Sequence, residues 1–226
     1  MASGFAPFPI AIAVLGAYFC MHAAIKGAVE AADGDPLQDF CIADYEQPVH
    51  VTGYACKPAG EVTVEDFIHR GLAQRASTAN VNNATATLAF VEKFPALNSL
   101  GLSMARLDLD VGGIIPPHTH PRGSEIIFVI EGSLYAGFID TSNKLFARVI
   151  YPGEVMLFPR GLIHFQLNVG SSPACAVVAL NGQEPGLQFI ANSMFGSVGL
   201  KLDVLQKAFL ISSTEAAHLQ SVFTKI

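Results

Sequence analysis

The chain has few charged residues, no tryptophan and no excess of positive charge. Only 14% of its 226 residues are Asp, Glu, Lys or Arg, and the formal net charge is -6. A protein that binds the phosphate groups of nucleic acid needs a basic surface, so this composition argues against a nucleic-acid partner. The chain also lacks charge runs and internal repeats, while 51% of its residues are hydrophobic. These features predict one ordinary globular domain with a substantial core.

The N-terminal segment is the exception to soluble behaviour. Residues 5–24 are almost wholly apolar, about the length of a membrane span, and no basic residue precedes them. A single membrane anchor is therefore one reading, but Pro7 and Pro9 interrupt the segment and the small-residue pattern Val29-Glu30-Ala31 suits cleavage. We predict a secretory signal peptide over residues 1–31, cleaved between residues 23 and 32. A single domain over residues 32–226 then follows, free of the membrane.

Cysteine is scarce, with four residues in the chain. Cys20 would leave with the signal peptide. Cys41 and Cys56 lie in a polar, turn-rich segment at a separation typical of a local disulfide, which would stabilise the fold by roughly 3 kcal/mol. Cys175 lies in an apolar run and is predicted to be an unreactive core residue. Asn83 begins an Asn-Ala-Thr glycosylation sequon, which is consistent with secretion.

From Leu100 onward, apolar residues alternate with a period of two. On this pattern Ala105, Leu107, Leu109 and Val111 share one face of an extended segment. Turn sequences rich in glycine, proline and aspartate separate the strands. The predicted strands are 62–68, 126–130, 134–139, 145–151, 155–158, 163–169 and 174–180, and the apolar run 126–130 is predicted to be buried on both faces. Many short strands at near-regular spacing predict a β-sandwich or barrel.

The C-terminal tail changes to a helical period. Leu202, Leu205 and Phe209 are spaced for one helix face, and Ser212 with Glu215 can form a capping box before a second helix. Two short helices with apolar faces are therefore expected. They can pack on the chain's own barrel or on a neighbouring subunit.

Three histidines and a glutamate are spaced as metal ligands. His118 and His120 are two residues apart, so an extended chain points both side chains to one face. Glu125 follows a short turn, and His164 lies on a later strand that can return to the same point. Three imidazoles and one carboxylate suit manganese, iron, zinc or copper and leave two positions of an octahedral ion open. The short His-x-His motif by itself is equally compatible with ordinary polar residues, and His50, His69 and His218 lack such partners.

The whole constellation resembles the two sequence boxes of the germins and germin-like proteins in the cupin superfamily. The first box is Gly112, five residues, His118-Thr119-His120, four residues, Glu125, six residues and Gly132. The second is Gly153, five residues, Pro159, one residue, Gly161, two residues, His164, three residues and Asn168. The segments 35–41 and 53–57 resemble the start of mature germins. The resemblance implies an all-β cupin jelly-roll β-barrel with short C-terminal α-helices.

The resemblance also implies a cofactor, an assembly and a location. His118, His120, Glu125 and His164 match the ligands of a metal that is usually Mn2+, through which they would also be catalytic; Fe, Zn and Cu are not excluded by the sequence. Gln166 and Asn168 share the strand face of His164 and can support the ligands from behind, although Asn168 can equally be a turn or sheet-end residue. A homohexamer built as a trimer of dimers is implied, secreted to the apoplast or cell wall with a role in plant defence.

Three functions are compatible with this resemblance. Germin-like proteins often dismutate superoxide, which is the leading hypothesis. Oxalate oxidase, the activity of true germins, is disfavoured because Ala105 and Ile115 replace two asparagines that are thought to line the substrate site. The third is a non-enzymatic extracellular wall, storage or receptor-like (auxin-binding-type) module with a structural metal, whose more apolar pocket accepts a small anion or organic acid.

Overall fold

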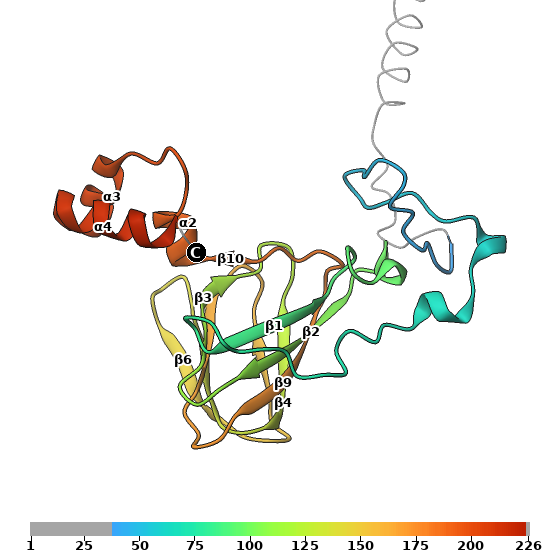
Figure 1. Ribbon diagram of the computed structural model, residues 1–226, viewed down its shortest axis with the longest axis horizontal. Coiled ribbons are helices and arrows are strands. Elements are labelled where there is room, and N and C mark those ends of the chain that lie inside the picture. The colour runs from blue at the N-terminus through green and yellow to red at the C-terminus, as the bar shows by residue number, and fades with distance from the viewer. Residues whose placement is uncertain (1–37, 225–226) are drawn as a thin grey trace, which may run out of the picture. The chain divides into compact units, whose positions relative to one another are not determined.

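Ten strands among the described residues form two antiparallel sheets of five strands each (Figure 1). The computed structural model describes residues 38–224, so the predicted signal peptide and its cleavage site lie outside the described residues. No helix of the described part is long and apolar enough to cross a membrane. The first sheet, in spatial order, contains β1 (Ala84–Ala89), β2 (Ser103–Leu109), β9 (Ala174–Leu180), β4 (Glu125–Glu131) and β7 (Val155–Phe158). The second contains β10 (Gln188–Phe189), β3 (Ile114–Thr119), β8 (Ile163–Asn168), β5 (Leu134–Ile139) and β6 (Leu145–Ile150).

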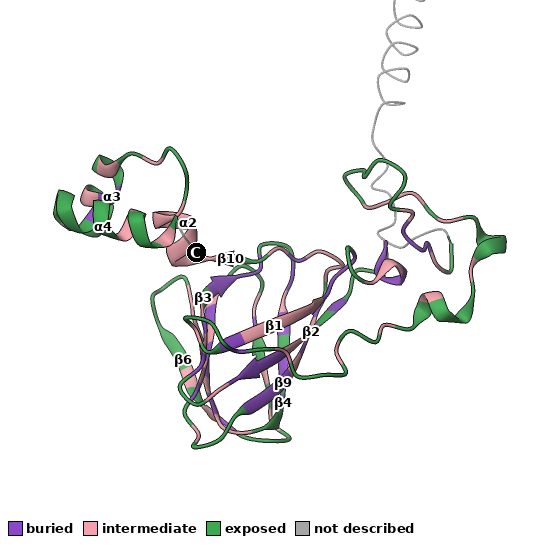
Figure 2. Cartoon of the chain, viewed as in Figure 1, coloured by how far each residue is buried: buried purple, intermediate pink, exposed green. Residues whose placement is uncertain are grey.

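The hydrophobic core lies between the two sheets. Alternate residues of each strand point inward, as the period of two predicts. Leu109, Ile127, Val129 and Leu134 have no exposed surface, and the buried residues of Figure 2 follow the same strands. The strands predicted over 134–139, 155–158 and 174–180 are confirmed at both ends. The all-β jelly-roll class expected from the sequence is therefore confirmed.

Strand β4 corrects the prediction that residues 126–130 are buried on both faces. Ile126, Phe128 and Ile130 are 46%, 46% and 43% exposed, whereas Ile127 and Val129 are fully buried. Only one face of each sheet packs on the other sheet, so the outward residues of β4 stay exposed in a single chain. Val111 is likewise exposed rather than inward, because β2 ends at Leu109 and Val111 lies in the turn that follows.

The strand predicted over residues 62–68 is wrong. Two short 3-10 helices, η1 (Ala59–Glu61) and η2 (Val64–Phe67), occupy this region. The Asp66 carboxylate accepts hydrogen bonds from the Thr63 backbone N–H at 2.7 Å and from Lys57 Nζ at 3.1 Å. Local side-chain bonds of this kind favour a capped turn over an extended strand. A third 3-10 helix, η3 (Pro95–Leu97), lies between β1 and β2.

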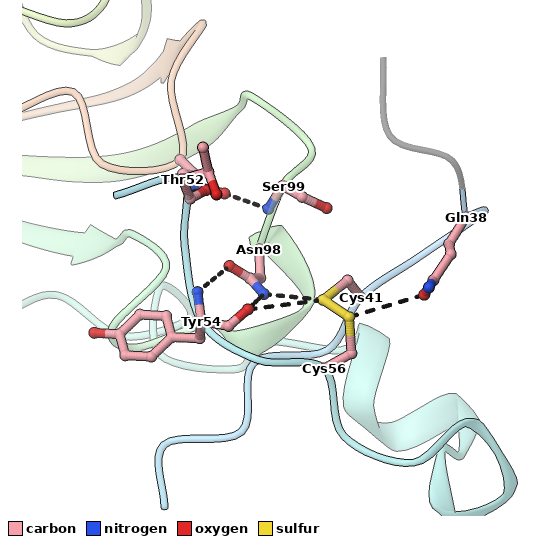
Figure 3. Close-up of a disulfide and its surroundings, with 8 residues drawn as sticks. Gln38, Cys41, Thr52, Tyr54, Cys56, Asn98 and Ser99 are labelled. Carbon is pink, nitrogen blue, oxygen red and sulfur yellow. Dashed lines mark hydrogen bonds between the residues drawn. A yellow bond between two sulfur atoms is a disulfide. The ribbon is translucent and has the colours of Figure 1, made fainter. Parts of the chain in front are cut away.

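The predicted disulfide between Cys41 and Cys56 is present. The two sulfur atoms are 2.09 Å apart and the Cα atoms 4.8 Å apart. Asn98, buried beside it, accepts a hydrogen bond from the Tyr54 backbone N–H at 3.0 Å and donates to the Tyr54 carbonyl at 2.9 Å (Figure 3). The disulfide loop is thereby fastened to the segment that enters the barrel. Cys175 is free and buried, as expected.

Opening this disulfide should destabilise the protein measurably. A Cys41→Ala/Cys56→Ala variant is expected to lose about 3 kcal/mol of unfolding free energy, because the unfolded chain regains the entropy of the open loop. Denaturant unfolding followed by circular dichroism measures this loss. Cys175→Ala removes a thiol without opening a loop and should cost about 1 kcal/mol or less. Equal losses in the two proteins would contradict a role for loop closure.

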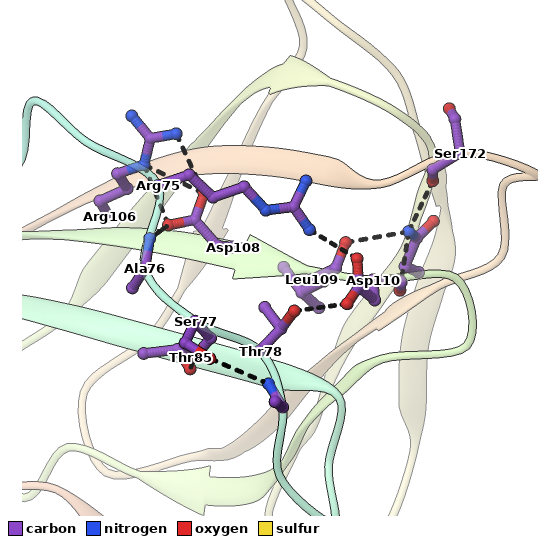
Figure 4. Close-up of polar contacts among 12 residues, drawn as sticks. Arg75, Ala76, Ser77, Thr78, Thr85, Arg106, Asp108, Leu109, Asp110 and Ser172 are labelled. Atoms are coloured by element: carbon purple, nitrogen blue, oxygen red, sulfur yellow. Dashed lines mark hydrogen bonds and ion pairs between the residues drawn. The ribbon is translucent and has the colours of Figure 1, made fainter.

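A polar cluster fastens the segment before β1 to the outward face of β2 (Figure 4). Asp108, only 1% exposed, accepts from the Ala76 backbone N–H at 3.0 Å and pairs with Arg106 at 3.0 Å. Asp110 pairs with Arg75 at 2.6 Å and accepts a hydrogen bond from Thr78. These bonds satisfy a carboxylate that the sheet would otherwise bury without partners.

The tail forms α2 (Ile190–Phe195), α3 (Leu202–Phe209) and α4 (Ser213–Phe223). The predicted capping box is present, since Ser212 Oγ accepts from the Glu215 backbone N–H at 3.2 Å and the Glu215 carboxylate accepts from the Ser212 N–H at 2.8 Å. Helices α3 and α4 pack mainly on each other and on α2, and α2 contacts β3 and β10. Helix α2 is thus the main attachment of the tail to the barrel, although the sequence pattern did not predict it.

Candidate metal centre

The four predicted metal ligands converge inside the barrel. His118 lies on β3 and His164 on β8, where the two residues are paired across the strands. His120 follows β3 directly, and Glu125 opens β4 in the other sheet. One ligand atom from each of the four residues lies within 4.8 Å of the others, and all four side chains are buried. Strand alternation turns His118 and His120 to one face, and the packing of the two sheets brings Glu125 and His164 to the same point.

Backbone carbonyls orient the three imidazoles. The Nδ1 atoms of His118 and His164 lie 2.8 Å and 2.9 Å from the carbonyls of Pro116 and Leu162, and His120 Nδ1 contacts the Gly186 carbonyl. A carbonyl only accepts, so each Nδ1 carries the proton and each Nε2 keeps a free lone pair. The Nε2 atoms of His120 and His164 lie 2.9 Å and 3.7 Å from the Glu125 carboxylate.

The charge states of the ligands suit a divalent cation. Burial, with the nearby His164, lowers the pKa of His118 to about 3, so this imidazole is neutral. Burial alone would raise the pKa of Glu125, but the adjacent His120 and His164 hold that pKa at about 2. Metal binding requires deprotonated ligands, and the Glu125 carboxylate and the His118 imidazole are already in that form.

One buried atom shows that the residues fit a metal ion. His164 Nε2 is buried and has no hydrogen-bond partner among the described residues. Leaving a buried polar atom unpaired costs roughly 1–3 kcal/mol, and a cation between the four ligand atoms would remove this cost. Three nitrogen donors and one oxygen donor without a thiolate fit manganese, iron, zinc or copper.

Three of the four ligands, His118, His120 and Glu125, border a cavity of about 30 Å³ with mostly apolar walls. A single water molecule needs roughly 10–15 Å³ of such space, so the cavity admits only a ligand of a few atoms. Ala105 of β2 and Ile115 of β3 line it and are 2% and 6% exposed. The two positions where true germins carry asparagine therefore lie inside the cavity, as the sequence predicts for Ala105.

The remaining predicted residues fall in different places. Gln166 lines the cavity beside the ligands. Asn168 instead donates hydrogen bonds to the carbonyls of Leu109, Asp110 and Ser172 and accepts one from the Gly170 N–H, which is the turn role left open by the sequence. His69 stacks on Phe94, 5.3 Å between ring centres, and neither it, His50 nor His218 belongs to the ligand cluster.

Sequence patterns missed the loop after β9 and the short strand β10. The Gly186 carbonyl orients His120, and the Phe189 ring lies 5.5 Å from the His118 ring. Backbone carbonyls carry no residue-type signal, and a two-residue strand has no period. Only the fold brings this loop to the metal ligands.

The comparisons decide the family. A family model described as Cupin matches residues 70–217. "Germin-like protein 1-3" of Oryza sativa subsp. japonica is 45% identical over 214 residues, which are 93% of this chain and 96% of that protein. The chain belongs to the germin-like proteins. "Rhicadhesin receptor" of Pisum sativum is 47% identical over 190 residues, covering 84% of this chain and 88% of its own length.

Solved structures similar to this germin-like protein include oxalate oxidases. One, from a study of the oxalate oxidase mechanism, has a TM-score of 0.81 and 41% identity and covers 85% of this chain and 98% of its own. Another, a recombinant oxalate oxidase in complex with glycolate, has the same TM-score and 40% identity, covering 84% and 96% of the two chains. Relatives at similar sequence identity are thus named as a germin-like protein, a receptor and an oxalate oxidase. Similarity alone therefore does not identify the reaction of this protein.

The loop that holds His120 also carries Glu184, a carboxyl group that should respond to pH. Burial raises the pKa of Glu184 to about 6, and the adjacent Glu92 adds to the shift. The folded state therefore favours protonated Glu184, so its contribution to stability is full below pH 4.5 and is lost as the pH rises through about 6. Allowing for partial exposure, wild type should lose about 1 kcal/mol relative to Glu184→Gln across this window. Unfolding at several pH values tests this, and parallel profiles would contradict it.

Proposed function

We propose that this germin-like protein is a secreted manganese protein that dismutates superoxide and does not oxidise oxalate. The observation that carries the proposal is the small apolar cavity bordered by His118, His120 and Glu125 of the ligand cluster. Dismutation converts two superoxide ions and two protons into dioxygen and hydrogen peroxide, molecules that fit such a space. A bound manganese ion would supply the one-electron redox chemistry.

The protein's own residues supply position, charge and exclusion of water. The carbonyls of Pro116, Leu162 and Gly186 hold the imidazoles with their lone pairs inward. Glu125 contributes one negative charge, so a divalent ion would leave the site with net positive charge that attracts a small anion. The apolar walls lower the local dielectric and strengthen this attraction.

Oxalate is a poor fit for the same cavity. It carries four oxygen atoms and two negative charges, which need hydrogen-bond donors when they leave water. Ala105 and Ile115 offer methyl groups at the two positions where asparagines would donate. Recognition of a polar substrate fails when its partners in the site cannot form hydrogen bonds.

Secretion is supported by two features of the described residues. The Cys41–Cys56 disulfide suits an oxidising compartment. Asn83, the sequon residue, is exposed in the turn before β1. We infer that the protein reaches the apoplast or cell wall with a glycan on Asn83, which a glycosidase-dependent mass shift that Asn83→Gln abolishes would test.

A hexameric assembly is supported by apolar surface that one chain leaves exposed. Ile126, Phe128 and Ile130 of β4, with Val155 and Leu157 of β7, form an outward apolar face of the first sheet. Such a face commonly marks a subunit interface. We infer the trimer of dimers implied by the family resemblance; light scattering should give a hexamer mass for wild type and a smaller particle for Phe128→Asp.

The first experiment combines metal analysis with turnover assays on wild type and His118→Ala. Wild type is expected to hold about one manganese ion per chain, to dismutate superoxide and to leave oxalate unchanged. Loss of a ligand should abolish both metal retention and dismutation. His69→Ala, which changes a histidine outside the cluster, is the matched control. Robust oxalate oxidation by wild type would overturn the proposal.

A second candidate is a non-enzymatic module with a structural metal. A relative at 47% identity is named a receptor, and this name supports a binding role. A structural role predicts full metal occupancy and no turnover of either substrate. It also predicts that metal removal unfolds the chain, whereas a dismutase should regain activity when the ion is returned.

A further inference from the structure

One asparagine of the chain lies in a setting that favours attack by its own backbone. Asn181 is followed by Gly182, and this is the only Asn-Gly pair in the sequence. The pair lies in the bend after β9, where Asn181 is exposed to solvent. Because glycine has no side chain to shield its nitrogen, the Gly182 nitrogen can approach the Asn181 side chain closely.

The backbone nitrogen of Gly182 is not engaged in a hydrogen bond. Among the described residues, no backbone or side-chain oxygen accepts from the Gly182 N–H. An amide nitrogen has to give up its proton before it can act as a nucleophile, and an N–H that already donates within the fold keeps its proton. The proton of Gly182 is therefore accessible to water.

The carboxamide of Asn181 is prepared for attack by a hydrogen bond to its oxygen. Asn181 Oδ1 accepts from the Ser124 backbone N–H at 2.6 Å. When a nucleophile adds to the carboxamide carbon, negative charge develops on this oxygen. A donor that already points at the oxygen stabilises that charge without further rearrangement. The same bond that fixes the side chain thus lowers the barrier to its modification.

We propose that Asn181 is a site of spontaneous deamidation and isoaspartate formation. The Gly182 nitrogen gives its proton to water and bonds to Cγ of Asn181, and the Cγ–Nδ2 bond breaks to release ammonia. The product is a cyclic succinimide. Water then opens the ring at either of its two carbonyls, which leaves aspartate or isoaspartate at residue 181. Water is the only co-reactant, and no electrons are exchanged.

The modification would weaken the metal centre, a link that rests on the proposed manganese site. Besides the bond to Oδ1, the Asn181 backbone N–H donates to the Ser124 carbonyl at 3.2 Å. Ser124 directly precedes Glu125, and the loop after Asn181 carries the Gly186 carbonyl that contacts His120. An isoaspartate adds one methylene group to the backbone between these anchors. Manganese should then bind about tenfold more weakly, as when groups that orient metal ligands are lost.

Peptide mapping of the intact, manganese-loaded protein tests the site. Samples are kept at neutral pH for several weeks, digested, and analysed by mass spectrometry with fragmentation that separates isoaspartate from aspartate. Residue 181 should convert progressively.

Two other asparagines are internal controls in the same digest. Asn98 is buried, and both ends of its amide are hydrogen-bonded to Tyr54. Asn143 is exposed like Asn181, but the N–H of the following Lys144 donates to Asp140 at 2.9 Å. Both asparagines should stay unmodified while residue 181 converts. Equal conversion at Asn143 would show that exposure alone decides, against the role of the free Gly182 nitrogen.

Two variants test the chemistry. Gly182→Ala adds a methyl group beside the attacking nitrogen and should slow conversion at least about tenfold. The added methyl group would lie 3.0 Å from the Arg122 carbonyl, so a second variant leaves Gly182 in place. Asn181→Gln keeps a carboxamide but can cyclise only to a larger, less favourable ring, and it should stay unmodified. An unmodified residue 181 in wild type, or equal rates in wild type and Gly182→Ala, would overturn the site.

Chelator competition before and after the incubation separates the site from its link to the metal centre. A tenfold loss of manganese affinity in wild type, with no loss in equally incubated Asn181→Gln, would support the link. Modified wild type with unchanged affinity would overturn the link and leave the modification site standing. Wild type that binds no manganese would overturn the proposed function and the link together, whereas conversion of Asn181 would still be detected.

Discussion

Glu125→Gln is expected to weaken manganese binding by at least about a hundredfold, or roughly 2.7 kcal/mol. Glu125 is the only negatively charged residue in the ligand cluster, and the site around it is buried. An amide has nearly the same shape but no net charge, so the desolvated cation would lose its main electrostatic partner. Competition with a chelator of known affinity, followed by metal analysis, measures the change.

Glu131→Gln is the matched control for this substitution. It makes the same chemical change at the exposed far end of β4, away from the cavity. Its manganese affinity should equal that of wild type. If Glu125→Gln retained wild-type affinity, the ion would be held elsewhere and the metal centre described above would be wrong.

Oxalate turnover should rise by about 10²–10⁴-fold in an Ala105→Asn/Ile115→Asn variant. Each asparagine adds an amide donor to the cavity, and a hydrogen bond to a charged oxygen contributes about 1.5–3 kcal/mol. Two such bonds therefore give the expected range, while wild type should show almost no turnover. Ala105 and Ile115 are only 2% and 6% exposed, so the two asparagines would bury polar groups. The variant should therefore also be less stable than wild type when oxalate is absent.

Steady-state oxidation of oxalate, with metal content measured on the same sample, checks this expectation. Ala105→Val/Ile115→Val changes the cavity shape without adding donors and should remain inactive on oxalate. Equal inactivity of the asparagine variant at full manganese occupancy would show that other parts of the cavity exclude oxalate. High oxalate turnover in wild type would show that these asparagines are dispensable.

Local patterns in the sequence were enough to predict much of the fold and the ligand set. Strand 134–139 was correct at both ends because turn residues bound an apolar run of strand length. The ligands were predicted because His118 and His120 share one strand face and the second box repeats a family pattern. The family resemblance was needed for the function, since periodicity alone gives only a β-sandwich or barrel.

The errors arise where tertiary context decides. Residues 126–130 are all apolar, and this composition does not show what covers the outward side chains of the strand. Burial of both strand faces could therefore not be established from the sequence alone. Residues 62–68 look extended by propensity, but the Asp66 carboxylate caps a turn instead. Strand β1 alternates alanine with threonine, which gives a weak hydrophobic period. The carbonyl of Gly186 and the ring of Phe189 reach the site only through the complete fold.

Glu125 belongs to one sheet, whereas His118 and His164 belong to the other. A bound ion would therefore act as a cross-link between the two layers, and the complete site exists only after the layers have closed on each other. Metal binding is then a late step of folding, and a bound ion indicates that the two sheets have packed correctly. Because the unfolded chain lacks the site, free metal at 100 times its dissociation constant should add about 2.7 kcal/mol of stability. The supply of metal in the compartment where the chain folds would thus help determine how much folded protein persists.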